Sequence, residues 1–302
     1  MHGPRALHRP ATPRGLALTA ASAHLSRMNV MSRQPAPAVA PPQPRVYSGV
    51  NWTGVKTLYL KEVRRFWKVG AQTVAAPVVT TLLYMMIFVV AMGSSRTVNG
   101  ASFGLFVAPG LIMMAMLNNA FANASSSLIQ AKIMGTAPDF LTPPLTPLEL
   151  LIGFSLGAAT RGVLVGLVTA AAVWPFAHYT IAQPWAVAFF GIAACLLMAL
   201  VGVAAGLWSE KFDHLAAVTN FVVMPMTFLS GTFYSIERLP QPFREATRYN
   251  PFFYMIDGFR YGFLGGRPEG SVAVGAAFVG ALVVVLALAC WQLFRSGWRL
   301  KT

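Results

Sequence analysis

Most of the chain alternates between long apolar stretches without any charged residue and short charged segments. A helix needs about 20 apolar residues to cross about 30 Å of hydrocarbon, so each long stretch can hold at least one membrane span. The stretches without Asp, Glu, Lys or Arg are 69–95, 97–131, 162–209, 214–236 and 270–294. Trp174-Pro175 and Gln183-Pro184 interrupt the third stretch, which therefore completes one span and contains another. The pattern predicts six transmembrane helices, near 71–92, 103–124, 149–173, 185–207, 215–234 and 271–293.

Composition supports an all-α membrane protein and argues against two other classes. Charged residues make up 11% of the sequence and hydrophobic residues 56%. So few charges cannot cover the surface of a soluble enzyme of this size, and so many apolar residues exclude a disordered protein. The two cysteines, Cys195 and Cys290, lie in apolar runs and are predicted to be buried hydrophobic residues rather than a disulfide or a metal site.

Residues 1–48 differ from the rest, because they are rich in Pro, Ala and Arg and contain no acidic residue. Such a segment cannot bury a core, so we expect a disordered basic tail followed by one transmembrane domain over 49–302. A later translation start, at Met28 or Met31, is the alternative, and an organellar transit peptide is a weaker one. Much of the net charge of +14 lies outside the apolar body, where it suits anionic lipid head groups better than nucleic acid.

Cationic residues in the connections predict which side of the membrane each connection faces. An even number of spans places both termini on the same side. Lys and Arg residues cluster just before the first span and after the last, whereas the first connection holds only Arg96 and the third only His178. Because cytoplasmic loops are enriched in Lys and Arg, both termini are predicted to be cytoplasmic. The fifth connection, about 232–270, is then external, although its own arginines argue against this placement.

Residues 51–69 have the pattern of an amphipathic helix directly before the first span. Aromatic and aliphatic residues recur every three or four positions, with cations largely between them. Such a helix lies in the plane of the lipid head groups, and a surface helix of a soluble domain is the alternative. The residues that define this interfacial helix are Trp52, Tyr59, Arg64, Arg65, Phe66 and Trp67.

Arg161 is the one formal charge in the interior of a predicted span. Burial of a charge in the membrane costs at least about 3 kcal/mol, and no predicted span carries an acid in its interior. Asn118 and Asn119 are among the polar partners that remain. Two hypotheses stay open: Arg161 faces a polar translocation path together with Asn118 and Asn119, or it is a structural residue that ties helices together.

The run Gly153-Phe154-Ser155-Leu156-Gly157 matches the G-x-S-x-G pattern of serine hydrolases, but that motif needs a strand and a sharp turn before the helix. Here it lies inside an apolar helical run, and no histidine lies inside a span to act as a base. We therefore interpret the small-xxx-small pairs as faces for close helix packing, namely Gly153/Gly157, Gly162/Gly166 and Gly202/Gly206.

The second connection, 130–142, combines apolar residues with a stiff junction. Prolines at 143, 144 and 147 follow it and fix the direction in which the third span leaves. Apolar side chains outside the membrane indicate a groove in a partner protein, whereas an ordinary helix–helix loop is the alternative. The residues predicted to make this contact are Lys132, Ile133, Met134, Asp139, Phe140 and Leu141.

The fifth connection carries many aromatic residues together with a few charges. Asn250 can cap a helix whose first turn holds Pro251, and Asp257 and Arg260 lie three positions apart on that helix. A segment this apolar yet charged does not suit a full span. We therefore predict an interfacial or re-entrant helix pair over 240–264, between the fifth and sixth spans.

The same segment resembles the signature of the ABC-2 family of ABC-transporter permeases, in which an Asn-Pro pair and a Tyr precede Asp-x-x-Arg and a closing Leu-Gly. The matching residues are Asn250, Pro251, Tyr254, Asp257, Arg260, Leu264 and Gly265. The run that begins at Leu229, the prolines at 143–147 and Arg161-Gly162 are also similar, so the resemblance covers about 50–300. It is strongest for the lipooligosaccharide and drug exporters of the family. The second connection departs from the pattern, because it lacks the Glu- and Arg-rich stretch common before the prolines.

The resemblance implies the transmembrane subunit of an ATP-binding cassette exporter, in a bacterial plasma (inner) membrane. Two copies, as a homodimer, would enclose the path and bind two ATPase subunits on the cytoplasmic side, with 130–142 as the coupling element. Aromatic and Met-rich spans indicate an amphiphilic substrate, such as a lipid-linked saccharide or a hydrophobic drug. The sequence contains no G-x-x-x-x-G-K-[ST] motif, so we expect neither ATP hydrolysis by this chain nor a cofactor.

Two other classes of protein are alternatives to a permease subunit. A self-contained secondary transporter or channel for a hydrophobic small molecule usually carries acids within its spans or an inverted repeat, and neither is evident here. A membrane-embedded enzyme would need a cluster of His, Cys or acidic residues, which the predicted spans lack. The sequence therefore favours a non-catalytic permease subunit.

Overall fold

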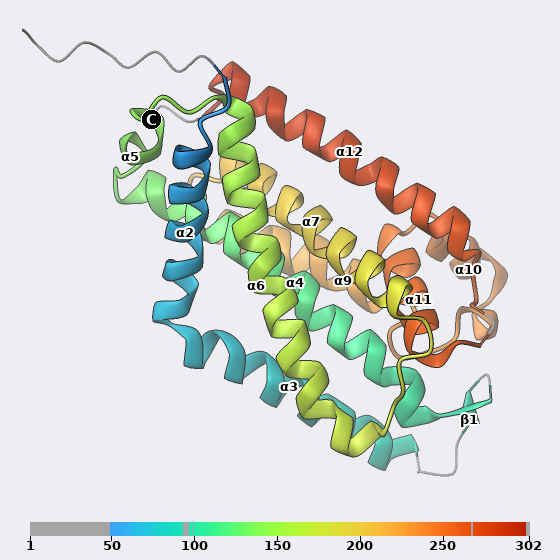
Figure 1. Ribbon diagram of the computed structural model, residues 1–302. Helices are drawn as coiled ribbons and strands as arrows, with labels where there is room; N and C mark the ends of the chain where they lie inside the picture. Colours follow the sequence, from blue (N-terminus) through green and yellow to red (C-terminus); the bar gives the residue numbers. More distant parts are fainter. Residues whose placement is uncertain (1–48, 93–96, 99, 267, 300–302) are drawn as a thin grey trace, which may run out of the picture. The chain divides into compact units, whose positions relative to one another are not determined.

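The computed structural model describes residues 49–92, 97–98, 100–266 and 268–299, so the predicted disordered tail lies outside the described residues. This part of the chain is helical apart from one short hairpin and the connecting loops (Figure 1). The helical elements are α2 (Trp52–Lys68), α3 (Gly70–Met92), α4 (Phe103–Ile133), α5 (Pro138–Leu141), α6 (Pro147–Ala177), α7 (Pro184–Trp208), α8 (Phe212–Val218), η1 (Thr219–Val223), α9 (Met224–Phe228), η2 (Ile236–Arg238), α10 (Gln241–Arg248), α11 (Pro251–Leu264) and α12 (Val272–Ser296). Strands β1 (Thr97–Val98) and β2 (Ala101–Ser102) pair antiparallel in the first connection, where the sequence predicted only a loop.

Five helices in the described part of the chain are long and apolar enough to cross a membrane: α3, α4, α6, α7 and α12. They match five of the six predicted spans, although α4 and α6 are longer than predicted, at 31 residues each. α6 starts early because Thr146 and Glu149 form a capping box, with Pro147 in the first turn. α4 continues through its Asn- and Ser-rich part, where side chains such as Ser125 and Ser127 bond to the protein itself.

The fifth predicted span, near 215–234, is not confirmed. This part of the chain forms three short consecutive elements, α8, the π-helical η1 and α9, and the last of them ends at Phe228. The chain then turns through Gly231, whose φ of 76° favours glycine. The helical run over 212–228 is therefore shorter than the about 20 residues that a straight span needs.

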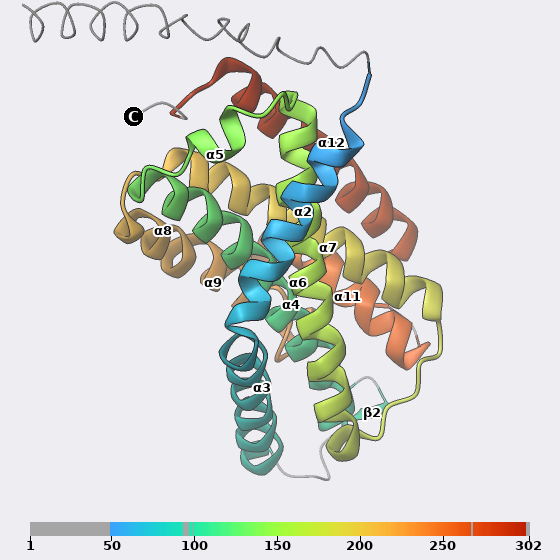
Figure 2. The ribbon, with the colours of Figure 1, turned by 60° about the vertical axis from the view of Figure 1, so that its left-hand side comes forward.

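α4 is the most deeply buried of the five long helices. It packs against α6 and α7, and 83% of its most apolar 18-residue stretch is buried. The corresponding stretches of α3 and α12 are only 17% and 11% buried. These two helices therefore present apolar surface that lipid or another chain can cover. Figure 2 shows α2 beside α6, with α3 continuing from the end of α2 after a bend at Val69.

Glycines allow α6 and α7 to approach α4 closely. A Cβ atom at Gly202 of α7 would lie 2.6 Å from the backbone O of Phe121, and one at Gly166 of α6 would lie 2.4 Å from Cγ of Met116. The interpretation of these glycines as packing faces is confirmed. Ser155 lies within α6, where its hydroxyl donates to the backbone one turn earlier, so the G-x-S-x-G run has no strand and no sharp turn.

Replacement of Gly202 by alanine should lower the thermal stability of the purified protein in detergent. The added methyl group would meet backbone of Phe121, which cannot move aside, so we expect a cost of about 1–3 kcal/mol. Gly280→Ala is the matched control, because Gly280 lies in α12 and an added Cβ there has no atom within 4 Å. That variant should be as stable as the parent or slightly more so, since alanine is the better helix former. Equal melting temperatures for the two variants would contradict the packing interpretation.

Candidate functional site

The signature segment begins at the junction of α10 and α11. Oδ1 of Asn250 accepts a hydrogen bond from the backbone N of Phe252 at 3.0 Å, which confirms the predicted cap of α11. Nδ2 of Asn250 donates to the backbone O of Met226 at 2.8 Å, so the same side chain also binds α9. Pro251 occupies the first turn, where a missing N–H costs nothing, and Gly265 ends the helix with a φ of 65°.

Asp257 fixes the segment that leads from α11 to α12. Its carboxylate is buried and accepts hydrogen bonds from the backbone N of Glu269 at 3.1 Å and of Gly270 at 2.8 Å. Burial raises the pKa of the Asp257 carboxyl, while these backbone N–H groups and the nearby Arg260 act in the opposite direction. Tyr254, one turn earlier, packs on Phe278 of α12 at 5.3 Å between ring centres. The signature thereby holds α12 against α11.

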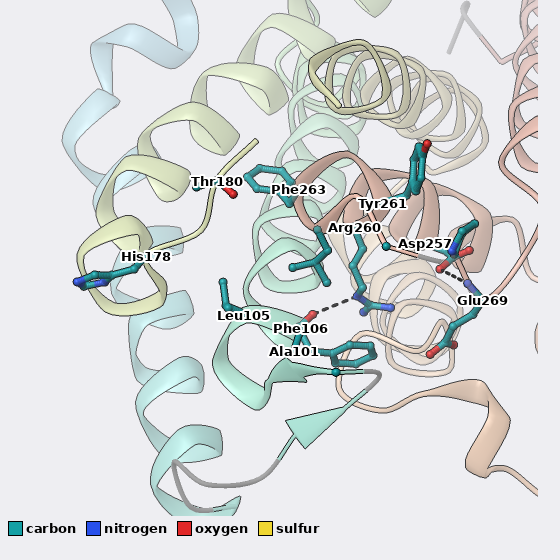
Figure 3. A pocket seen from close by; sticks show the side chains of 14 residues that line it. Ala101, Leu105, Phe106, His178, Thr180, Asp257, Arg260, Tyr261, Phe263 and Glu269 are labelled. Atoms are coloured by element: carbon teal, nitrogen blue, oxygen red, sulfur yellow. Dashed lines mark hydrogen bonds between the residues drawn. The ribbon is translucent and has the colours of Figure 1, made fainter. Parts of the chain in front are cut away.

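Arg260 is buried and connects three segments of the chain. Its Nε donates to the backbone O of Phe106 at 3.1 Å and its Nη2 to that of Gly231 at 2.8 Å. The guanidinium also lies over the ring of Phe106, 3.9 Å from the ring centre. Figure 3 shows the side chain pointing from α11 towards α4. Arg260 and Asp257 each bind backbone groups, and the ion pairs within 4 Å in the described part of the chain lie elsewhere.

A cavity of about 380 Å³ lies beside these residues, near the β1–β2 hairpin (Figure 3). Its polar lining includes Asp257 and Arg260 from α11, and His178 and Thr180 from the α6–α7 connection. His178 follows α6 in the left-handed region, and its ring stacks on Trp174 and is turned away from Arg260. Among the described residues no group of His, Cys, Asp and Glu could hold a metal ion. The cavity therefore lies where the first, third and fifth connections meet.

A second polar group, which we name the arginine cluster, lies where α2, α4 and α6 meet. Glu62 of α2 is fully buried, and its carboxylate binds Arg65 at 3.3 Å and the hydroxyl of Ser127 at 2.7 Å. Arg65 also donates to the backbone O and to Oδ1 of Asn123, at 2.6 and 2.9 Å. The cluster consists of Glu62, Arg65, Asn119, Asn123, Ser126, Ser127 and Arg161. One cation of the predicted interfacial helix thus attaches that helix to α4.

Arg161 enters the arginine cluster from α6. Its Nη2 donates to Oδ1 of Asn119 at 3.1 Å, and its Nη1 donates to Oδ1 of Asn123 at 3.5 Å. The side chain therefore ties α6 to α4. Its partner Asn119 also lines a cavity of about 240 Å³ between α3 and α4, together with Asn118. The structure therefore joins Arg161 to Asn119, while Asn118 is related to them only through the lining of this cavity.

Sequence reasoning did not single out Glu62 as a site residue. One signal was available, because Glu62 lies four positions from both Leu58 and Phe66, which are the buried residues of an amphipathic helix. The carboxylate fits there because α6 carries Gly157 opposite, where an added Cβ would lie 2.6 Å from the Cβ of Glu62. Asn123 was one of several polar residues that could meet Arg161, because the sequence does not show which neighbour an Asn inside an apolar helix binds.

The remaining residues of the predicted interfacial helix point in two directions. Phe66 is buried, and the hydroxyl of Tyr59 shares a hydrogen bond with Thr160 of α6 at 3.2 Å. Trp52 and Trp67 point away from the body of the protein and are 70% and 68% exposed. Its cations divide in the same way, since Arg64 is exposed whereas Arg65 turns into the arginine cluster.

The start of α2 is joined to the start of α6 by hydrogen bonds. The Glu149 carboxylate accepts from the backbone N of both Asn51 and Thr146. Nδ2 of Asn51 donates to the backbone O of Pro144 at 3.3 Å. The proline junction, α2 and α6 therefore meet in one hydrogen-bonded joint, which sequence patterns did not predict.

The predicted coupling segment comprises the end of α4, the short helix α5 and the loop between them. One part of that prediction is wrong. Phe140 is 4% exposed, packs edge-on against Phe154 of α6 at 5.3 Å and lies under Lys61 at 5.6 Å. Its apolar ring finds apolar neighbours within its own chain, so it cannot enter the groove of a partner. A charge at position 140 would therefore disturb the fold as well as any contact with a partner.

Lys132 is also engaged within the chain, because its Nζ donates to the backbone O of Leu207 and, at 3.1 Å, of Ser209 at the end of α7. The other apolar residues of the segment are accessible, with exposed fractions of 53%, 65% and 37% for Ile133, Met134 and Leu141. Asp139 is exposed beside them. The accessible surface of the segment, which we name the α5 surface, consists of Ile133, Met134, Asp139 and Leu141.

Five apolar helices of membrane-spanning length, with polar side chains bound inside the bundle, define a multi-pass α-helical membrane protein. The ABC-2 type transporter family matches residues 53–264, a range that runs from α2 to the end of α11. The chain belongs to this family of permeases, as the signature resemblance indicated.

Two proteins of known name are similar over most of their length. The inner membrane transport permease YadH of Escherichia coli (strain K12) is 34% identical over 252 residues, which cover 83% of this chain and 98% of YadH. Nodulation protein J of Rhizobium leguminosarum bv. viciae is 25% identical over 256 residues, which cover 82% of this chain and 95% of that protein.

Arg260→Lys should lower the stability of the folded protein although it keeps the charge. A lysine cannot bind two carbonyl groups in the fork geometry of a guanidinium while also stacking on Phe106, so we expect a loss of about 1–3 kcal/mol. The matched control is Arg248→Lys, because Arg248 is exposed at the end of α10. Thermal unfolding in detergent measures both variants. If both melt at the temperature of the parent, the buried bonds of Arg260 do not stabilise the fold.

Proposed function

We propose that this chain is the transmembrane subunit of an ATP-binding cassette exporter of the inner membrane, which moves an amphiphilic substrate such as a lipid-linked saccharide or a hydrophobic drug. Family membership supports this proposal, and so does the name of the Escherichia coli relative, an inner membrane transport permease. A separate subunit would hydrolyse ATP, because the sequence contains no G-x-x-x-x-G-K-[ST] loop to hold its phosphates. Energy must then enter this chain through a contact with that subunit.

The α5 surface is the observation that carries the proposal. It presents exposed apolar side chains at the end of α4 and beyond it, and Met134 and Leu141 lie outside the helices that are long enough to span a membrane. Phe140 anchors the same segment to α6 through Phe154, and Lys132 anchors it to α7. A push on the α5 surface would therefore displace α6 and α7 instead of bending a loop. This is the property that a contact with an ATPase subunit requires.

Two cavities of different character support an amphiphilic substrate. The cavity between α3 and α4 has polar residues in its lining, including Asn118 and Asn119, and Asn119 is bonded to Arg161. Another cavity, of about 340 Å³, has an almost wholly apolar lining that includes Met116 and Phe259. We propose that the polar part of a substrate passes through the cavity between α3 and α4, while its apolar part stays in contact with apolar protein surface or lipid.

We further propose that two copies of this chain act together with two ATPase subunits. α3 exposes apolar side chains along its length, among them Val79, Leu83 and Met86. A second copy that packs on this face would close the cavity lined by Asn118 and Asn119. α12 exposes a comparable face, including Val285 and Leu288, which would then contact lipid.

Cysteine labelling tests the proposed orientation, with both termini and the α5 surface in the cytoplasm. The background is a variant without Cys195 and Cys290, both of which are buried. Thr180→Cys, exposed in the α6–α7 connection, should react with a membrane-impermeant maleimide in intact spheroplasts. Asp139→Cys, exposed in α5, should react only after the membrane is permeabilised. Labelling of position 139 in intact spheroplasts would reverse the orientation.

Met134→Asp tests the proposed coupling contact without disturbing the core. The side chain is 65% exposed, so the variant should reach the membrane in normal amount and melt at the temperature of the parent. A charge buried in a partner's groove without a counter-ion costs several kcal/mol, so recovery of the co-expressed ATPase subunit should fall at least about tenfold. Transport should fall with it.

Ile181→Asp is the matched control for this experiment, because Ile181 is 52% exposed in the α6–α7 connection, which we place on the other side of the membrane. It should recover the ATPase subunit as well as the parent does. Normal recovery with Met134→Asp as well would show that the ATPase binds elsewhere. The parent chain purified without the ATPase subunit should hydrolyse no ATP.

A further inference from the structure

Two guanidinium groups approach each other through one shared acceptor in the arginine cluster. Oδ1 of Asn123 accepts from Arg65 at 2.9 Å and from Arg161 at 3.5 Å. One carboxylate lies nearby, that of Glu62, and it already binds Arg65 and the hydroxyl of Ser127. Arg161 forms no ion pair with an acid in the described part of the chain. The cluster therefore carries a net positive charge.

The groups that lack a hydrogen-bond partner in the arginine cluster are donors. Nε of Arg161 and Nδ2 of Asn123 are both buried and meet no acceptor among the described residues. Asn123 is 0% exposed, so bulk water does not satisfy its free amide group. Buried donors are normally satisfied, and two unmet donors beside a net positive charge match the oxygens of an anion. Arg161 is half-buried, so a ligand can reach part of its side chain, and it meets the buried Nε only after local movement.

The arginine cluster lies at the level where α2 ends and α3 begins. Arg64 and Lys68 are exposed within one turn of Arg65, and exposed cations of this kind reach into the head-group layer. The apolar window of α3 starts at Gly70, directly after them. Trp67, which is 68% exposed, is a residue type enriched at the same boundary. The anion expected beside the end of α2 is therefore the head group of a lipid.

From this arrangement we infer that Arg161 and Arg65 form a binding site for the phosphate group of an amphiphile in the leaflet beside α2. The guanidinium of Arg161 supplies its free Nε–H, Asn123 supplies its free amide N–H, and Arg65 adds charge and fixes the position of Asn123. The inference deepens the proposed function, because it names the head group that Arg161 would hold. It rests on that function for the membrane setting only and does not require an ATPase subunit.

The test is the thermal unfolding of the purified full chain in a neutral maltoside detergent, titrated with soluble short-chain lipids. Dihexanoyl phosphatidic acid should raise the melting temperature in a saturable way, because a ligand that binds the folded state stabilises it. Dihexanoylglycerol, which has the same acyl chains and no phosphate, should give no saturable rise. Inorganic phosphate should act only at concentrations at least about tenfold higher, because it lacks the acyl chains that partition beside α2.

Arg161→Gln separates a binding role from a structural one. The substitution loses the bonds to Asn119 and Asn123 but also removes a buried charge that has no acidic partner, so the variant without lipid should melt close to the temperature of the parent. Its apparent affinity for phosphatidic acid should be at least about tenfold weaker. The matched control is Arg64→Gln, which removes the same charge from the exposed side of α2 and should bind like the parent. Arg161→Lys, which keeps the charge but loses the fork geometry, should weaken binding with an unchanged fold.

Three results would overturn the inference. The first is a much lower melting temperature of Arg161→Gln together with normal lipid binding. Binding would have to be normal both for Arg161→Lys and for the fraction of Arg161→Gln that folds, and Arg161 would then have a structural role only. Equal loss of binding in Arg64→Gln and Arg161→Gln would show general attraction to a basic surface. Equal affinity for inorganic phosphate and phosphatidic acid would show a site for free anions. None of these results bears on ATPase recovery by Met134→Asp, so the two proposals can fail separately.

Discussion

A polar side chain inside a bilayer has no water to bind, so each one needs a partner within the protein. In this permease the partners of the signature residues are mainly backbone groups at the ends of helices. Arg260 binds carbonyl groups of two other segments, Asp257 binds two amide groups, and Asn250 binds one of each kind. These bonds satisfy backbone groups at the end of α9, at the start of α11 and in the segment that leads to α12. The helical segment over 212–228 can stop short of a full span because the signature supplies the bonds that a continued helix would have made.

The same constraint explains why α4 is the most buried of the long helices and yet carries more polar residues than any other of them. Its glycine-lined neighbours approach closely enough that side chains such as Asn119 and Asn123 reach the facing helices. α3 and α12 are much less buried and expose apolar surface. Rigid packing at the centre and free apolar surface at the edges agree with a subunit that assembles with another copy and with lipid.

The charge-free intervals predicted five of the spans because a membrane imposes a minimum apolar length that no other environment requires. They could not show the interruption at η1, since a π-helical turn and a regular helix have the same composition. The prediction for Phe140 failed for a related reason. An apolar residue outside the membrane has the same sequence pattern whether it packs within its own chain or against a partner. The spacing of Asp257 and Arg260 indicated a shared helix correctly, but only tertiary contacts decide that each binds backbone. Likewise, the charge of Arg161 within a predicted span made that residue evident in the sequence. The sequence could not show that Glu62 and Arg65, from a helix about 100 positions earlier, lie beside it.

The hydrogen-bonded joint at Asn51 and Glu149 has a mechanical consequence. Together with the contact of Phe140 on Phe154 and the bond of Tyr59 to Thr160, it makes α2, α5 and the first half of α6 one rigid lever. The bend at Val69 is then the hinge where that lever meets α3. A tilt imposed at α5 would carry Arg161 and Arg65 with it, while α3 and its cavity stay behind. The shared acceptor Asn123 belongs to α4, outside this lever, so its bonds to the two arginines are contacts that such a stroke would load.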